Sequence, residues 1–218
     1  MTTANPKTPA QPKRLAVVSA GLGQPSSTRL LADRLSAATV AQLHAHGVEA
    51  EVEVIELRDL AHDITNNLLT GFPSPKLDAA ITAVSTADGL IAVTPVFNAS
   101  YSGLFKSFAD LFDPKTLRDL PVLVAATGGS ERHSLVLDHA LRPLFSYLHA
   151  VVVPTGVYAA SSDWGSGSAA GQSSLPDRIT RSARELAALV AASDRSARPL
   201  DPFVLDPSFS PIGAFSAD

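Results

Sequence analysis

The chain has 218 residues, of which 45% are hydrophobic, and it contains no cysteine. This length predicts one or two domains, and we favour one, whose core is large enough to be stable without disulfides. Without cysteine the chain has no disulfide, no thiolate nucleophile and no cysteine-ligated zinc or iron–sulfur site. The net charge of −4 gives no general basic surface for nucleic acid or an anionic membrane. These properties indicate a globular protein of the cytoplasm.

Both ends of the chain are rich in proline. Residues 1–13 lack the apolar core of a signal peptide, and we expect them to form a disordered extension. The folded domain is expected over 14–196, followed by a proline-rich tail over 197–218. The tail carries large apolar side chains between its prolines, which favours contact with a partner protein or a second subunit. No apolar run approaches the roughly 20 residues that a membrane helix needs.

Short apolar runs alternate with helical patterns along the domain. The run over 14–20 is nearly continuous, which is typical of a strand covered on both faces. In chain order we expect a strand over 14–20, a helix over 28–46, a strand over 48–54, a helix over 77–85, a strand over 89–94 closed by Pro95, a helix over 101–112, a strand over 120–127, a helix over 135–149, a strand from 151 and a helix over 176–192. The Ser- and Gly-rich segment 161–174 is expected to be a mobile loop.

This alternation predicts an α/β fold in which right-handed crossovers join parallel strands and helices cover both faces. Five strands fit the flavodoxin-like order 2-1-3-4-5 or half of a dinucleotide-binding sheet, and we favour the flavodoxin-like three-layer sandwich. In both sheets ligands bind beyond the carboxyl ends of the strands, where the strand order reverses. The loops after the first, third and fourth strands are therefore the candidate ligand loops.

The loop after the first strand combines glycines with hydroxyl groups at the start of a helix. Backbone N–H groups, the positive end of a helix and short donors together suit a terminal phosphate with three acceptor oxygens. The loop lacks the Gly-Lys-Ser/Thr of a Walker A motif, and Ser26 stands where G-x-G-x-x-G requires its third glycine. The alternative is an ordinary helix cap after a glycine turn. The candidate phosphate contacts are Ser19, Gly21, Gln24, Ser26, Ser27 and Thr28.

The loop after the third strand suits a flat ring. Its candidate contacts are Pro95, Val96, Phe97, Asn98 and Tyr101, which combine small residues with two aromatic side chains. A planar heteroaromatic ring could lie against such a surface. The alternative is that Phe97 and Tyr101 pack in the core.

The loop after the fourth strand contains two consecutive glycines. Thr127, Gly128 and Gly129 would let the backbone approach the edge of a ring. Arg132 could bind a second phosphate, and His133 could bind a ring carbonyl or a phosphate. Ordinary surface or capping positions are the alternative for both residues.

Two stretches resemble the NADPH-dependent FMN reductase family. The pattern Ser19-x-Gly21-x-Gly23-x-x-Ser26-x-Thr28-x-x-Leu31-Ala32 is similar to the family's phosphate loop, S-G-S-x-R-x-x-S-x-N-x-x-L-A. Residues 95–100, with Gly103, Lys106 and Asp110, resemble the family's P-x-Y-N-x-S-x-P-G-x-L-K-x-x-x-D stretch, which is the stronger match. The resemblance covers about residues 14–160 and is greatest to actinobacterial members that serve flavin-dependent monooxygenases.

The resemblance implies FMN as cofactor, NADPH as hydride donor, and a monooxygenase that receives the reduced flavin. Ser19, Ser26 and Thr28 would hold the FMN phosphate, while residues 95–98 and 127–129 would edge the isoalloxazine. Arg132 is a candidate for the 2′-phosphate of NADPH, and His133 for a flavin carbonyl. The chain departs from the family pattern at Gly23, where the family has its loop arginine, and at Ser102, where it has proline.

A flavin would itself carry the hydride chemistry, so no catalytic side chain and no metal are expected. The neighbours Ser130, His133 and Asp138 could suggest a hydrolase, but their sequence spacing establishes no geometry. A quinone or azo reductase on the same fold and a flavodoxin-type electron carrier also remain open. We also expect a homodimer, with contacts through 161–174 and 101–112, because a flavin on the rim of one small domain would be open to water.

Overall fold

The computed structural model describes residues 11–165 and 173–195. The expected extension before residue 11, residues 166–172 of the expected mobile loop, and the tail 197–218 lie outside these ranges. In chain order the elements are β1 (Lys13–Ser19), α1 (Ser27–Ala45), β2 (Ala50–Glu56), the 3₁₀ turn η1 (Leu57–Leu60), α2 (Ala61–Thr70), α3 (Pro75–Ser85), β3 (Gly89–Phe97), β4 (Ser100–Tyr101), α4 (Gly103–Ala109), β5 (Pro121–Gly128), the 3₁₀ turn η2 (Glu131–His133), the π-helix η3 (Leu137–Leu141), α5 (Arg142–Tyr147), β6 (Val151–Val152), β7 (Val157–Ala160), the 3₁₀ turn η4 (Ser161–Trp164) and α6 (Leu175–Ala192).

The sheet is parallel along the path β2-β1-β3-β5-β6, which is the strand order of flavodoxin-like folds. The expected order is therefore confirmed, but the sheet has seven strands rather than the expected five. One extra strand is the short β4, which runs antiparallel to β3. The other arises because the fifth expected strand is interrupted, and both of its pieces, β6 and β7, pair with β5.

The interruption between β6 and β7 contains Pro154, which has no N–H for the ladder. Side chains satisfy the backbone groups that leave the sheet here. Arg142 donates to the carbonyls of Val153 and Pro154, and the Thr155 N–H donates to a Glu185 carboxylate oxygen at 2.7 Å. The break in the strand therefore leaves these polar groups paired.

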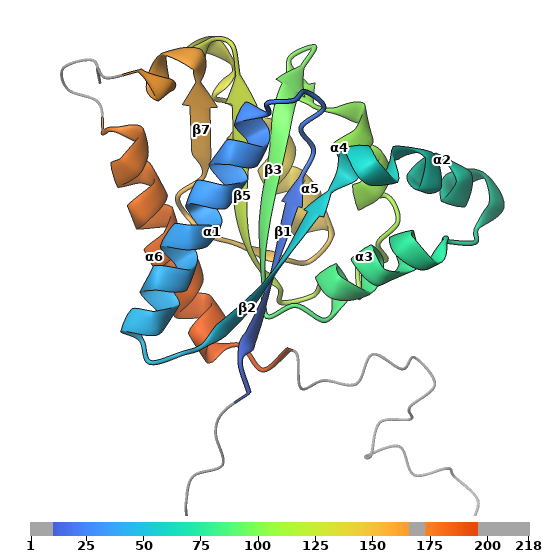
Figure 1. Ribbon diagram of the computed structural model, residues 1–218, viewed down its shortest axis with the longest axis horizontal. Helices are drawn as coiled ribbons and strands as arrows, with labels where there is room; N and C mark the ends of the chain where they lie inside the picture. Colours follow the sequence, from blue (N-terminus) through green and yellow to red (C-terminus); the bar gives the residue numbers. More distant parts are fainter. Residues whose placement is uncertain (1–10, 166–172, 196–218) are drawn as a thin grey trace, which may run out of the picture.

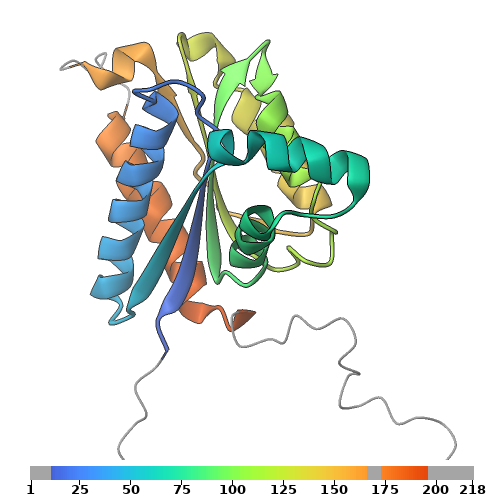
Figure 2. The ribbon, with the colours of Figure 1, turned by 45° about the vertical axis from the view of Figure 1, so that its right-hand side comes forward.

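Helices cover both faces of the sheet, as the two ribbon views show (Figures 1 and 2). On one face, Leu15 and Val17 of β1 pack with α1 and α6. On the other, Ala16 and Val18 pack with α3, α4 and α5. This alternation is the one expected for a strand covered on both faces.

Strand β3 continues to Phe97, so the expectation that Pro95 closes it was wrong. The reason is that β1 ends early: its ladder with β3 stops at Ser19 opposite Val93, and the Ala20 N–H donates to the Val93 carbonyl. Pro95 faces the same side as Val93, because alternate residues of a strand point their backbone groups the same way. No β1 acceptor lies opposite Pro95, so its missing N–H costs no ladder bond.

Two expected helices are shorter than predicted. The segment 101–112 begins as strand β4, and its helix α4 spans only Gly103–Ala109. The segment 135–149 is divided into the π-helix η3 and the helix α5. Pro143 explains the division, because it cannot donate an i−4 hydrogen bond, and the preceding Arg142 N–H donates five residues back to Leu137.

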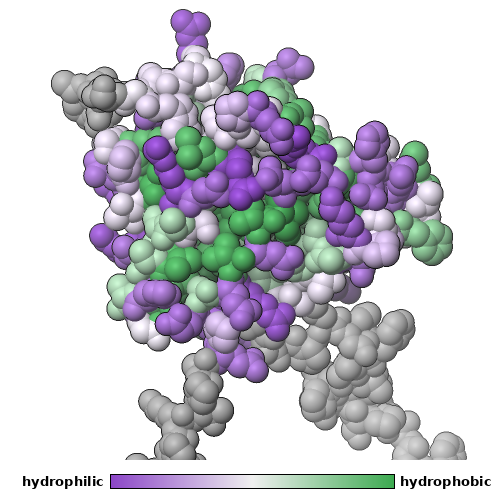
Figure 3. Space-filling model, viewed as in Figure 1, coloured by the Kyte–Doolittle hydropathy of each residue, from purple (hydrophilic) through white to green (hydrophobic). Residues whose placement is uncertain are grey.

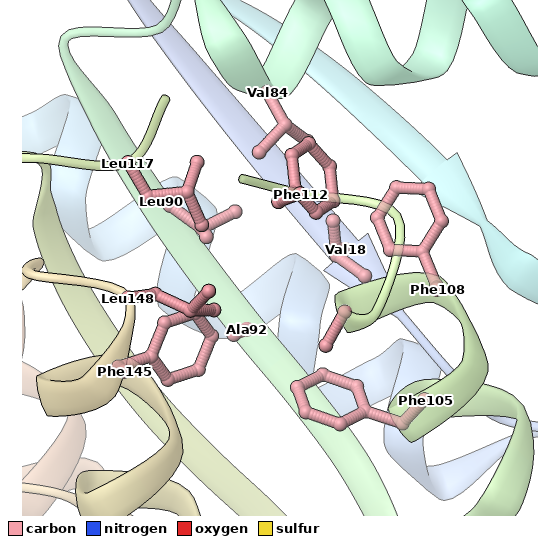
Figure 4. Close-up of a pocket in the computed structure, with 11 residues that line it drawn as sticks. Val18, Val84, Leu90, Ala92, Phe105, Phe108, Phe112, Leu117, Phe145 and Leu148 are labelled. Carbon is pink, nitrogen blue, oxygen red and sulfur yellow. The ribbon is translucent and has the colours of Figure 1, made fainter. Parts of the chain in front are cut away.

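Two hollows lie away from the carboxyl ends of the strands. An apolar cavity of about 20 Å³ sits among Phe105, Phe112 and Phe145 under the sheet, and it is far too small for a cofactor (Figure 4). A groove of about 560 Å³ runs between the edge strand β2 and α3. Val52 and Val54 of β2 are exposed. The face shown in Figure 3 has an apolar area near its centre.

Candidate functional site

A pocket of about 370 Å³ opens at the carboxyl ends of β1, β3 and β5. The three loops singled out from the sequence meet there, and the turn η4 after β7 closes a fourth side. The lining residues are Leu22, Gly23, Pro25, Ser26, Ser27, Thr28, Pro95, Val96, Phe97, Thr127, Gly128, Gly129, Ser161 and Trp164. We call this the rim pocket.

Nine sequence-predicted contacts line the rim pocket: Ser26, Ser27, Thr28, Pro95, Val96, Phe97, Thr127, Gly128 and Gly129. The other predicted contacts are not among its lining residues: Ser19, Gly21, Gln24, Asn98, Tyr101, Arg132 and His133. The contacts predicted from the sequence did not include Leu22, Gly23, Pro25, Ser161 or Trp164. The first three lie inside the predicted phosphate loop, so the loop was found and only its members differ.

Ser26 is the N-cap of α1. Its backbone is extended, and its Oγ accepts a hydrogen bond from the Arg29 N–H at 3.1 Å. A side chain at Gly21 is excluded, because its Cβ would lie 2.0 Å from this Oγ. The loop therefore folds tightly against the cap. This places the hydroxyls of Ser26 and Ser27 and the positive end of α1 at one side of the pocket.

Thr28 and Thr127 join the phosphate loop to the loop after β5. Their Oγ1 atoms lie 2.8 Å apart, and both residues are buried while still lining the pocket. Nearby, the buried Oγ of Ser19 has no hydrogen-bond partner within the described part of the chain. An unpaired buried hydroxyl is costly, and its place under the phosphate loop is consistent with a polar ligand or water there.

The loop between β3 and β4 is a two-residue hairpin turn at Asn98 and Ala99. Both residues have positive φ, 47° and 69°, which alanine rarely adopts. The turn is anchored below by Thr94, whose Oγ1 accepts from the Ser102 N–H at 3.0 Å. Phe97 is left 47% exposed at the pocket. Tyr101 instead packs on Phe105, with ring centroids 5.9 Å apart.

The Gly128–Gly129 segment is held by Tyr158 of β7. The Tyr158 hydroxyl donates to the Ser130 carbonyl at 2.6 Å, and a Cβ on Gly128 would lie 2.1 Å from that hydroxyl oxygen. Burial, with a smaller effect of the Asp163 charge, raises the pKa of Tyr158 above its usual value. Arg132 and His133 follow on the exposed turn η2, outside the pocket wall.

Trp164 borders the pocket from the turn η4. Its ring stacks on the Arg34 guanidinium of α1, whose carbon lies 5.0 Å from the ring centroid. Asp163 fixes the turn by accepting from the Ala160 N–H at 2.8 Å and by pairing with Arg178. Trp164 is the only tryptophan of the chain and lies in a Ser- and Gly-rich segment. This unusual position is the feature of the sequence that could have indicated this side of the pocket.

The lining residues of the rim pocket include no carboxylate, amine, guanidinium, imidazole or phenol within the described ranges. In residues 11–165 and 173–195 no cluster of histidine, aspartate or glutamate could hold a metal ion. Over the same ranges, no helix has the length and apolar character of a membrane span. The pocket therefore offers hydroxyls, backbone amides and flat walls, which suit the binding of a phosphorylated ring compound.

The chain is similar in sequence to known FMN reductases. A family model described as NADPH-dependent FMN reductase matches residues 13–165. An NADH-dependent FMN reductase, SfnF, of Pseudomonas fluorescens is 43% identical over 71% of this chain and 80% of its own length. An FMN reductase (NADPH) of Pseudomonas aeruginosa is 42% identical over 70% of this chain and 80% of its own length. The crystal structure of an oxidoreductase from Corynebacterium diphtheriae has a TM-score of 0.80 and 48% identity, covering 84% of this chain and all of that one.

Proposed function

The chain belongs to the NADPH-dependent FMN reductase family, and we propose that its FMN binds in the rim pocket with the phosphate at the start of α1. The chain is an NAD(P)H:FMN oxidoreductase. One observation supports the placement of the FMN. A single pocket joins a helix start rich in hydroxyls to flat, backbone-lined walls, and its lining has no titratable side chain.

The phosphate end of the proposed site is the first turn of α1. Ser26, Ser27 and Thr28 would donate hydroxyl hydrogens to phosphate oxygens, supported by the dipole of the helix. This turn contains no acidic residue that would repel a dianion. Thr28 can accept the hydrogen of Thr127 and still donate its own, because a hydroxyl is both acceptor and donor.

The ring end of the proposed site lies between two backbone segments. Residues 95–97 would form one wall, and Gly128 with Gly129 would form the other. Apart from Gly129 and its two chain neighbours, no heavy atom of the described residues lies within 4 Å of the position that a Cβ would take on Gly129, so a ring edge can approach the backbone there. Trp164 would border the bound ligand.

When bound, FMN supplies the hydride-accepting chemistry, so the chain need not provide a catalytic acid or base. The residues of this chain would bind the phosphate, orient the ring edge through backbone groups and limit its exposure to water. The described pocket lining contains no titratable side chain, and this supports a role of the chain in binding the flavin rather than in proton transfer.

We propose that Arg132 and His133 contact a phosphate of the nicotinamide nucleotide. Both are exposed on η2, three and four residues beyond Gly129 of the pocket wall. One relative is NADH-dependent and another uses NADPH. A contact between Arg132 and the 2′-phosphate would favour NADPH in this chain.

We further propose that the enzyme acts in the cytoplasm as a homodimer and passes reduced FMN to a flavin-dependent monooxygenase. Phe97 and Trp164 stand at the border of the pocket, where a second subunit would limit access of water. Analytical sedimentation of the purified protein tests the dimer. A fully active, stable monomer would contradict it.

The function is tested by following NADPH and NADH oxidation by flavin-free protein with and without added FMN. We expect oxidation that depends on FMN, saturates with it and is faster with NADPH. A quinone is then offered to the FMN-loaded enzyme in place of free flavin. A quinone reduced much faster than free FMN would favour a quinone reductase, and no FMN-dependent oxidation would contradict the proposal.

A further inference from the structure

Arg58 reaches the phosphate loop from a different part of the chain. It lies in η1, directly after β2, and its Nη1 is 3.5 Å from the Leu22 carbonyl oxygen and 3.4 Å from that of Gly23. The Gln24 side-chain amide also faces this guanidinium; in the amide orientation that satisfies hydrogen bonding, its oxygen accepts from Nη1 at 3.1 Å and from Nη2 at 3.2 Å. Neither Arg58 nor Gln24 lines the rim pocket. Arg58 therefore holds the loop from its outer side.

The contact of Arg58 with the two carbonyls also determines where the neighbouring N–H groups point. In a trans peptide the carbonyl of one residue and the N–H of the next point in opposite directions. With the carbonyls of Leu22 and Gly23 turned to Arg58, the N–H groups of Gly23 and Gln24 turn away from it, toward the pocket side. Neither N–H donates to any partner within the described residues. Both are free to bind an anion.

Arg58 also supplies charge that the pocket lining lacks. Another cation, Arg29 in the first turn of α1, is paired with Asp33 at 2.8 Å and with Glu56. Among the described residues Arg58 pairs with one carboxylate, that of Asp59, at 3.5 Å, and the Asp59 side chain is 58% exposed. Solvent screens such a pair strongly, so the cation of Arg58 remains effective at the loop.

We propose that Arg58 is a positioning residue for the FMN phosphate. It orients the N–H groups of Gly23 and Gln24 toward the phosphate and places a positive charge behind the loop. Gly23 itself cannot supply that charge, so a residue from another element provides it. This inference rests on the proposed binding of FMN in the rim pocket.

The test compares FMN with riboflavin, which has the same ring but no phosphate. Dissociation constants are measured for the unaltered protein, Arg58→Gln and the control Arg181→Gln, which removes an equal charge from an exposed position of α6. We expect Arg58→Gln to weaken FMN binding by about tenfold or more and to change riboflavin binding by less than about twofold. Arg181→Gln should change neither constant.

Arg58→Lys separates orientation from charge, because lysine keeps the charge but cannot form the fork of hydrogen bonds. We expect this variant to remain weakened for FMN by about fivefold or more. Full FMN affinity in Arg58→Lys would overturn the orienting role, and equal losses for FMN and riboflavin in Arg58→Gln would overturn the phosphate role. Thermal unfolding of both variants verifies that they are folded at the assay temperature.

A separate variant distinguishes this inference from the placement of FMN. Ser26→Ala with Thr28→Ala removes two proposed phosphate donors without touching Arg58. If this double variant loses FMN affinity and Arg58→Gln does not, only the inference about Arg58 is wrong. If neither variant loses affinity, the phosphate lies elsewhere and the placement itself is wrong.

Discussion

The hydroxyls of Thr28 and Thr127 lie 2.8 Å apart and join the first turn of α1 to the carboxyl end of β5. The two residues are 99 positions apart in the chain, and both are buried at the wall of the rim pocket. This hydrogen bond couples the proposed phosphate end of the site to the segment that precedes Gly128 and Gly129. Changes at either threonine should therefore affect both stability and flavin binding.

Substitution of these threonines by valine measures the coupling. Each single change, Thr28→Val or Thr127→Val, should lower the free energy of unfolding by about 1–3 kcal/mol, because a buried hydroxyl is left without a partner. The double variant should lose less than the sum, by about 1 kcal/mol, since both partners are then gone. Urea denaturation of the four proteins gives the coupling energy. Strictly additive losses would show that the hydrogen bond contributes nothing.

Removal of phosphate donors should weaken FMN binding specifically. Ser26→Ala with Thr28→Ala should cost about 1.5–3 kcal/mol of binding free energy for each charge-assisted hydrogen bond lost. Ser26 is also a helix cap, so Ser74→Ala is the matched control: Ser74 caps α3 in the same way, with its Oγ 3.2 Å from the Leu77 N–H. Ser74→Ala should lower stability alone. An unchanged FMN affinity in the double variant would contradict the proposed site.

The raised pKa of Tyr158 predicts that the folded protein loses stability at alkaline pH. Burial raises its pKa in the folded chain, whereas in the unfolded chain the phenol loses its proton at about pH 10. Between these two pKa values the unfolded chain binds fewer protons, so the free energy of unfolding falls as pH rises. Tyr158→Phe should remove part of this fall. Tyr147→Phe is the control, because Tyr147 is 72% exposed, and an equal effect of both changes would refute the role of burial.

The hairpin turn after β3 stores backbone strain at Ala99, whose φ is 69°. Ala99→Gly should raise the free energy of unfolding by about 0.5–1 kcal/mol. The left-handed conformation costs alanine about 1–2 kcal/mol and glycine nothing. The greater conformational freedom of glycine in the unfolded chain cancels part of this gain. The same change at exposed Ala41 within α1 should instead lower stability by about 1 kcal/mol. Thermal unfolding compares the two variants. A destabilised Ala99→Gly protein would contradict the strain.

The main strands of the sheet were predictable because their apolar runs are nearly continuous. Residues 14–20 and 120–127 predicted β1 and β5 to within one residue at each end. Both strands are covered by helices on each face, so every position in them favours an apolar side chain. The strand order followed from the alternation of strands and helices, since crossover connections restrict the topologies.

Local patterns failed where other parts of the chain decide the structure. Helix α2 was not predicted, because it contains Thr65, Asn66 and Asn67, which are weak helix formers, and buries only Ile64. Pro95 lies within β3 because β1 ends too early to need its N–H. The sequence of one strand contains no information about the length of its neighbour.

Local sequence patterns likewise predicted only part of the proposed site. The phosphate loop and the glycine pair were recognisable because their residue types are unusual at strand ends. Trp164 and Arg58 were not assigned to the site, because each reaches it from an element that follows a different strand. Their contribution depends on the fold rather than on a local motif.

The most direct test of the proposed site is a crystal structure of the protein with FMN bound. We expect phosphate oxygens within hydrogen-bonding distance of Ser26, Ser27 and Thr28, and an isoalloxazine ring between residues 95–97 and Gly128–Gly129. A flavin found outside the rim pocket, or one bound there with its phosphate away from α1, would contradict the proposed site.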